Sequence, residues 1–221
     1  MTILLTRPIE DATTFAQALE FNGVECMIEP MLNIKMVDSA NDEFKKLDLD
    51  DYQAIVTTSR HALKALDVEK GTRIIHVGNA GGSVESLIEF IHTTVNPADG
   101  PLLYCRGQHI RADLVSALPK FQIDELITYY SVKSTQFSEA ALQAFKDGNI
   151  KGVVFFSFRT AEAFLNCIEQ ANIMGVLSHL KAFCISDTVA GVIEPHPFEA
   201  IYICPNTTRE GMLDLIQNNC L

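Results

Sequence analysis

Several features that would assign this 221-residue chain to a membrane or disordered class are missing. There is no low-complexity tract, and no apolar run approaches the ~20 residues that a membrane-spanning helix needs. Hydrophobic residues nevertheless make up 48% of the chain and charged residues 20%, which is enough for a buried core. We therefore expect a globular, cytoplasmic protein without a leader peptide.

Metal and nucleotide signatures are also absent. The six cysteines contain no C-x-x-C pair, and the six histidines contain no H-x-H or H-x-x-x-H pair. We expect free thiols, because cysteine packs as a small apolar side chain in a reducing compartment, and no metal site. The first predicted strand is followed by TRPIED (Thr6–Asp11) and not by G-x-G-x-x-G, which argues against a dinucleotide-binding enzyme. We expect no cofactor.

Positive charge is scarce in this chain. Lys and Arg number 17 against 28 Asp and Glu, so the net charge is −11 and the isoelectric point is near 4.9. This field repels phosphate backbones and anionic lipid surfaces, so we expect neither a nucleic-acid nor a membrane partner. An anionic small molecule would need a locally positive cleft.

Short apolar segments alternate with amphipathic helical segments, a pattern typical of parallel sheets with crossover helices. Most predicted helices begin at Ser, Thr, Asp or Pro, as helix capping requires; two of them are Ser59–Ala65 and Ser157–Ala171. The predicted strands are Ile3–Thr6, Glu25–Glu29, Ala54–Thr57, Arg73–Val77, Leu102–Cys105, Gly152–Phe156, Ala182–Ile185 and Ala200–Cys204.

An internal repeat predicts two similar α/β lobes. IVTTSRHAL (Ile55–Leu63) and VVFFSFRTA (Val153–Ala161) both read as a strand, a serine, a cationic side chain and a helix. Strand-like segments at the borders of the halves predict a two-stranded ladder that joins the lobes. The N-terminal strand and helix then belong to the C-terminal half. The predicted boundaries are 1–35 with 134–221 for one lobe, 39–122 for the other, and 31–37 with 123–132 for the connecting strands.

Seven segments, taken in order, resemble the uroporphyrinogen-III synthase family over essentially the whole chain. They are LLTRP (Leu4–Pro8), TTSRHAL (Thr57–Leu63), HVGNAGG (His76–Gly82), LLYCRGQHIRADL (Leu102–Leu114), the strand around Tyr129, VVFFSFRTAEAF (Val153–Phe164) and PNTTREGML (Pro205–Leu213).

The resemblance implies two flavodoxin-like lobes joined by a β-ladder, with the substrate held in the cleft between them. It also implies a cofactor-free lyase that closes the linear tetrapyrrole hydroxymethylbilane into a macrocycle, inverts the last ring and releases water. The expected protein is a monomer whose partners are this substrate and, in transient contact, hydroxymethylbilane synthase.

A substrate with an acetate and a propionate on every pyrrole calls for carboxylate binding more than for a strong nucleophile. Helix N-termini bind anions, and in open α/β sheets they lie with the carboxyl ends of the strands. Each hydroxyl at such a turn is equally explained as a helix cap, and each glycine as a tight turn. The predicted substrate-binding residues at these turns are Ser59, Gly81, Gly82, Ser157, Thr188 and Thr208.

Three arginines complete the predicted binding set. Arg7 follows the first strand, and Arg106 and Arg111 flank Gly107 after the strand LLYC. Arginine suits bidentate carboxylate binding. The alternatives are a solvated side chain for Arg7 and a helix-start salt bridge with Asp113 for the other two.

The resemblance assigns the catalytic role to Tyr129, which would donate a proton to the departing hydroxyl. Tyr130 is one residue away and would lie on the opposite face of the strand, and a merely packed tyrosine is the alternative. Gly81-Gly82 and Val189 stand where the family commonly has hydroxyl residues, so backbone amides are the expected donors there.

Two other classes of protein share parts of this pattern. A phosphorelay receiver needs clustered acidic residues at its strand ends, and neither Thr6–Arg7 nor Thr57–Ser59 supplies them. A non-catalytic two-lobed binding protein for a small polyanionic ligand would show the same cations and stays open as the alternative.

Overall fold

The computed structural model describes residues 2–80, 83–110 and 113–220. The chain forms two compact units. Unit 1 comprises Met1–Asn33 and Val132–Leu221, and unit 2 comprises Ile34–Ser131. The N-terminal segment therefore belongs with the C-terminal part of the chain. Two α/β units with this connectivity confirm the predicted fold class.

Unit 1 contains a five-stranded parallel sheet in the order β10-β9-β8-β1-β2. The inner strands are almost fully buried because helices cover both faces, and their sequences are correspondingly near-continuous apolar runs. The strands are β1 (Thr2–Leu5), β2 (Glu25–Ile28), β8 (Ile150–Phe155), β9 (Lys181–Cys184) and β10 (Ala200–Ile203).

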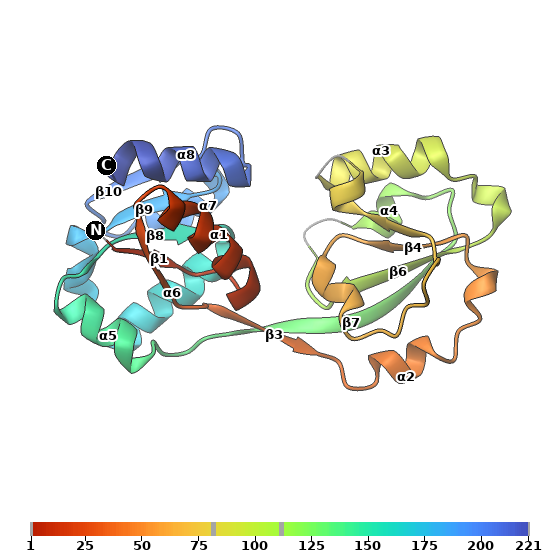
Figure 1. Cartoon of the computed structure of the whole chain (residues 1–221), viewed down its shortest axis with the longest axis horizontal. Coiled ribbons are helices and arrows are strands. Elements are labelled where there is room, and N and C mark those ends of the chain that lie inside the picture. The colour runs from red at the N-terminus through yellow and green to blue at the C-terminus, as the bar shows by residue number, and fades with distance from the viewer. Residues whose placement is uncertain (1, 81–82, 111–112, 221) are drawn as a thin grey trace. The chain divides into compact units, whose positions relative to one another are not determined.

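Two cores lie on opposite faces of this sheet, between it and the helices drawn around it in Figure 1. Helices α1 and α8 pack on one face, around Phe15 and Met212, whereas α5, α6 and α7 pack on the other, around Phe164. The helices are α1 (Ile9–Phe21), α5 (Glu139–Lys146), α6 (Phe158–Gln170), α7 (Asp187–Ile193) and α8 (Arg209–Cys220).

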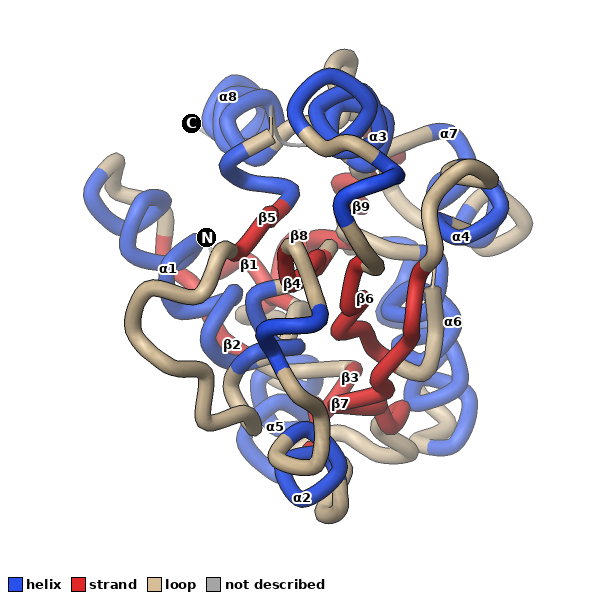
Figure 2. The backbone as a smooth tube through the Cα atoms, turned by 90° about the vertical axis from the view of Figure 1, so that its right-hand side faces the viewer, coloured by secondary structure: helices blue, strands red, loops and turns tan. Residues whose placement is uncertain are grey.

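The second five-stranded sheet has the order β3-β7-β6-β4-β5 and lies in unit 2, apart from the first residues of β3 and the last of β7; strands β4, β6 and β7 can be followed in Figure 2. Strands β4 to β7 are parallel. The Val37 N–H donates to Thr128, and the Ser134 N–H donates to Met31, so β3 and β7 run antiparallel. The expected ladder is this pair, continuous with the sheet. The strands are β3 (Leu32–Met36), β4 (Ala54–Thr57), β5 (Ile74–His76), β6 (Leu102–Gly107) and β7 (Ile123–Lys133).

The helices of unit 2 are α2 (Ala40–Phe44), α3 (Val84–Thr94) and α4 (Leu114–Ala117), of which α2 and α4 are short. The predicted helix Ser59–Ala65 is wrong, because only a 3₁₀ helix at Arg60–Leu63 forms there. The chain then turns toward α2, where Asn41 accepts a hydrogen bond from the Asp67 N–H and donates one to its carboxylate, both at 2.9 Å. These tertiary bonds outweigh the local helix signal.

Each predicted strand is present, with ends that differ by a residue or two from the expected positions.

Candidate functional site

Polar and cationic side chains follow the carboxyl ends of the parallel strands in both units. The strand order reverses between β1 and β8 in unit 1, and between β4 and β6 in unit 2. Open α/β sheets bind ligands outside the carboxyl ends of the strands at such switch points. Arg7 and Ser157 follow β1 and β8, whereas Ser59 follows β4 and Arg106 lies near the end of β6. The fold therefore brings predicted residues to the carboxyl edge of each sheet, which is the candidate ligand site.

Tyr129 of β7 lies against Gly107, the last residue of β6. A register shift after Arg106 sets Gly107 opposite Tyr129. A Cβ atom at residue 107 would stand only 2.6 Å from Tyr129 Cζ and 2.9 Å from its hydroxyl, so the ring occupies space that only glycine leaves open. The His61 ring is a neighbour of Tyr129, with the two ring centroids 6.0 Å apart.

The two neighbouring tyrosines differ in surroundings. Tyr129 is half-buried and packs against the core around Leu103 and Leu126, whereas Tyr130 is 38% exposed. Within residues 2–80, 83–110 and 113–220, the Tyr129 hydroxyl has no hydrogen-bond partner. The ring is thus positioned by packing while its proton is left for another acceptor.

A hydrogen bond crosses the switch point of unit 2. Thr58 Oγ1 lies 3.3 Å from the hydroxyl of Tyr104, a buried residue of β6 whose pKa is raised by desolvation. The adjacent Ser59 caps the short 3₁₀ helix, since its Oγ accepts a hydrogen bond from the His61 N–H at 3.3 Å. The hydroxyl of Ser59, predicted to bind substrate, therefore caps a helix at this edge.

Arg106 pairs with β7 and not with Asp113. Its Nε and Nη2 donate to the Glu125 carboxylate at 2.5 and 3.4 Å, and its Nη1 donates to the Gly107 carbonyl at 3.0 Å. Asp113 instead caps α4 by accepting from Ser116, and these hydrogen bonds lower the pKa of Asp113. Arg106 holds the end of β6 beside Tyr129, and a substrate carboxylate at Arg106 would compete with Glu125.

Arg7 is held on two sides at the edge of unit 1. Its Cζ lies 4.3 Å from the ring centroid of Phe156, and its Nη2 lies 3.2 Å from Asp11 Oδ2. The Phe156 ring attracts the guanidinium as a cation–π partner and so restrains its position at this edge. A quarter of the side chain is exposed.

The predicted hydroxyl residues of unit 1 lie in the first turns of helices. Ser157 Oγ accepts from the Thr160 N–H at 3.2 Å, and Thr208 Oγ1 accepts from the Gly211 N–H at 3.0 Å. Both are N-caps. Thr188 is the exposed second residue of α7, a helix of seven residues.

One helix start in unit 1 already holds a carboxylate. The N–H and the hydroxyl of Ser138, the N-cap of α5, both donate to Glu29 at 2.7 Å. Glu29 follows β2 and is only 9% exposed. The pair shows how this edge binds a carboxylate, and it removes the start of α5 from the candidate ligand sites.

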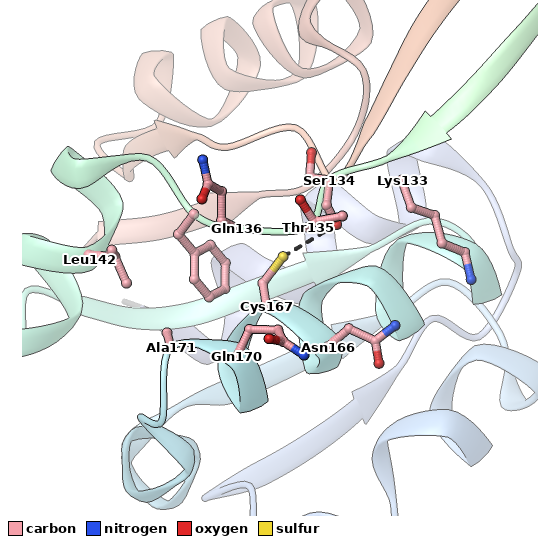
Figure 3. Close-up of a pocket in the computed structure, with 10 residues that line it drawn as sticks. Lys133, Ser134, Thr135, Gln136, Leu142, Asn166, Cys167, Gln170 and Ala171 are labelled. Carbon is pink, nitrogen blue, oxygen red and sulfur yellow. Dashed lines mark hydrogen bonds between the residues drawn. The ribbon is translucent and has the colours of Figure 1, made fainter.

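A groove of about 830 Å³ lies beside the C-terminal half of α6 (Figure 3). Its lining includes the amides of Gln136, Asn166 and Gln170. Lys133, which also lines it, pairs with Glu162 at 2.7 Å. A polycarboxylate finds little uncompensated positive charge there, so the arginine-bearing sheet edges are the better candidate.

Gly107, His61 and Glu125 were not among the predicted residues, although they surround Tyr129 and Arg106. Their contacts depend on the register between β6 and β7, which no local pattern reveals. The signal in the sequence was Gly107 at the end of a predicted strand, because glycine in a strand often marks a place where another part of the chain packs closely against the backbone. The predicted residues Gly81, Gly82 and Arg111 lie outside the described residues.

Two absences hold for the described part of the chain. No cluster of three or more His, Cys, Asp or Glu side chains is arranged there to bind a metal ion. No helix in those residues has the length and apolar character needed to cross a membrane.

The sequence model of the family described as uroporphyrinogen-III synthase HemD matches residues 67–214. Among solved structures, uroporphyrinogen-III synthetase from Helicobacter pylori is similar with a TM-score of 0.63 and 15% identity, over 99% of each chain. A mutant uroporphyrinogen III synthase from Thermus thermophilus gives a TM-score of 0.52 at 12% identity, over 100% of this chain and 97% of that one. At these identities the structures show likeness of fold. No curated protein sequence matches the chain.

The family match spans more than half of the chain and extends over both units. The solved structures share the arrangement of two α/β units over nearly their whole length. The chain therefore belongs to the uroporphyrinogen-III synthase family of haem biosynthesis.

Proposed function

We propose that this chain is a lyase that converts hydroxymethylbilane to uroporphyrinogen III, with loss of water and inversion of the last pyrrole ring. Membership of the family supports the reaction. The single structural observation that carries it is Tyr129, whose ring is positioned over Gly107 and whose hydroxyl has no partner among the described residues.

The first step needs an acid. As the C–O bond of the terminal hydroxymethyl group breaks, the Tyr129 phenol gives its proton to the departing hydroxyl, and water leaves. The neighbouring pyrrole nitrogen shares its electron pair with the carbon left behind and so stabilises the cation. A positioned acid of this kind typically contributes ~10²–10⁴-fold in rate.

The following steps need positioning. The substituted carbon of the last ring attacks the cation and forms a spiro intermediate. The bond between this carbon and the bridge carbon of the preceding ring then breaks. The other α-carbon of the last ring bonds to that bridge carbon, so the ring is inverted. The last ring carbon then loses a proton, which returns to the phenolate of Tyr129. One water is released in total and the enzyme is regenerated.

Binding of the substrate carboxylates is proposed for the carboxyl edges of the two sheets. Arg7 in unit 1 offers a guanidinium held over the Phe156 ring, and the first turns of α6 and α8 offer backbone N–H groups. The Glu29 pairing at α5 supports this assignment because it is the same interaction made within the protein.

The test uses freshly made hydroxymethylbilane and the purified protein, with separation of the oxidised porphyrins by isomer. We expect the inverted isomer to dominate and to form faster than spontaneous closure. A protein that only binds a polyanion would leave the uninverted isomer as the product, and that outcome would refute the proposal.

A further inference from the structure

Arg209 is the first residue of α8 and contacts the neighbouring helix α1. Its Nη2 donates to the Thr14 carbonyl at 3.1 Å, and its Cζ lies 5.8 Å from the ring centroid of Phe15. The nearest distance to Glu210 is longer, at 3.7 Å, and 38% of the side chain is exposed. Arg209 is therefore anchored by α1 and still presents part of its guanidinium to solvent.

Arg209 and Arg7 are linked through one pair of aromatic rings. Phe15, beneath Arg209, meets Phe156, beneath Arg7, edge to face with centroids 5.1 Å apart. Phe15 is fully buried, and Phe156 packs against the same core. The positions of the two guanidinium groups are thus tied to core packing and depend less on the freedom of surface side chains.

The position of Arg209 is unfavourable for the helix that carries it. The N-terminal end of a helix is the positive end of its dipole, where acidic side chains are favoured and cations are not. Arg7 likewise precedes α1 by a single residue, Pro8. An arginine at the N-terminal end of a helix does not stabilise that helix, which suggests a role in binding an anion.

The distribution of arginine along the chain points the same way. Of the six arginines in the described part of the chain, five lie at or after the carboxyl end of a parallel strand, and only Arg73 precedes one. In a chain of net charge −11, such a concentration is what a carboxylate-binding edge requires. The five are Arg7, Arg60, Arg106, Arg159 and Arg209.

We propose that Arg209 is a second carboxylate-binding arginine of unit 1, which together with Arg7 engages two carboxylates of one polyacid substrate. The inference rests on the proposed function, whose substrate carries two acid groups on every pyrrole. The role is binding and positioning of the substrate, so its loss should appear in KM and in the isomer ratio more than in kcat.

The experiment compares Arg209→Gln with Arg73→Gln. Arg73 is a matched control because it is exposed and donates to the Thr94 carbonyl at 3.2 Å, but it lies before β5 and away from the carboxyl ends. For Arg209→Gln we expect KM for hydroxymethylbilane to rise about 10-fold, kcat to change less than about twofold, and more uninverted isomer to escape. Arg73→Gln should match the wild type.

A second readout separates binding from folding. Fluorescence titration with the oxidised porphyrin polyacid, at low and high salt, should show weaker and less salt-dependent binding for Arg209→Gln than for the wild type. Arg209→Lys keeps the charge but not the planar fork, and we expect it to raise KM about two- to fivefold. Arg209→Lys also tests the binding role if the Arg209→Gln variant does not fold.

Unchanged KM and affinity in the Arg209 variants would overturn the inference while the proposed function stands. A lower unfolding temperature with a reduced kcat and an unchanged KM would also overturn it, because that pattern indicates a structural role. If the wild type itself makes no inverted isomer, the proposed function fails first.

Discussion

At the scale of single residues, Tyr129 and Gly107 connect strand register to the proposed chemistry. The ring of Tyr129 fills the space that a side chain at residue 107 would need. The hydroxyl makes no hydrogen bond within the described residues. Packing therefore positions the ring, and the proposed proton transfer depends on one oxygen atom.

Replacement of Tyr129 by Phe removes that oxygen and keeps the ring. We expect turnover of hydroxymethylbilane to fall by ~10²–10⁴-fold, with little change in the free energy of unfolding. Tyr130→Phe, one residue away and exposed, is the control and should retain wild-type turnover. Turnover of Tyr129→Phe within about twofold of wild type would remove the acid assignment.

Gly107→Ala tests the same site through shape. The new Cβ would stand 2.6 Å from Tyr129 Cζ, so the ring must move. We expect a loss of turnover together with a destabilisation of about 1–3 kcal/mol in denaturant unfolding. Gly175→Ala is the control, since a Cβ there meets nothing within 4 Å. In combination with Tyr129→Phe the further loss of turnover should be small; full additivity would mean that the two residues act separately.

The buried thiols predict a pH dependence of stability. Burial raises the pKa of Cys105 and of Cys184 to about 12, against 9.0 for an exposed thiol. The unfolded chain therefore loses these protons first, so the free energy of unfolding should be steady below about pH 9 and fall as the pH rises toward 12. Denaturant unfolding at several alkaline pH values measures this effect.

The same shifts predict slow alkylation, because the thiolate is the reactive form. Near pH 8 the native protein should protect both cysteines, and the urea-unfolded chain should not. Rapid native labelling of Cys105 or Cys184, read by mass spectrometry, would contradict the burial.

At the scale of elements, helix starts perform two tasks that a sequence pattern does not separate. Ser138 caps α5 and binds the protein's own Glu29, whereas Ser157 caps α6 at the switch point of unit 1. The same residue type at the same helical position is thus structural in one helix and a candidate for substrate contact in the other.

Ser157→Ala and Ser138→Ala form a matched pair. Each should lower the free energy of unfolding by about 1 kcal/mol through loss of the cap, and Ser138→Ala should lose more because the bond to Glu29 also disappears. KM for hydroxymethylbilane should rise in Ser157→Ala alone. Equal KM values in the two variants would assign Ser157 to capping only.

Predicted and observed elements agree where the signal is local. The inner strands of unit 1 are near-continuous apolar runs and were placed correctly, and the cap residues mark the starts of α5 and α6. The segment after Ser59 was predicted as a helix but forms a short 3₁₀ turn. There Asp67 is held by Asn41, a tertiary bond that outweighs helix propensity.

At the scale of the whole molecule, the proposed reaction needs an acid and carboxylate binding, and side chains and backbone amides can supply both. We therefore expect activity to survive exhaustive chelation and dialysis. The measurement is the rate of inverted-isomer formation before and after treatment, with the untreated protein as the control. A loss that only an added metal or nucleotide restores would show that a cofactor is needed.

The sequence by itself determined the alternation of strands and helices and the residue types that follow the strand ends. It also carried the division into two α/β units with the N-terminal segment in the C-terminal one. Apolar runs and capping residues act on their own neighbours, so they can be read in order along the chain.

Only the tertiary structure decided which of these residues meet. It placed Gly107 against Tyr129 and paired Arg106 with Glu125 and not with Asp113. It also packed Arg7 and Arg209 on two phenylalanine rings that contact each other. Such contacts depend on strand register and on the packing of helices across a sheet. A shift of one residue in register sends a side chain to the opposite face, and nothing in the local sequence prevents it.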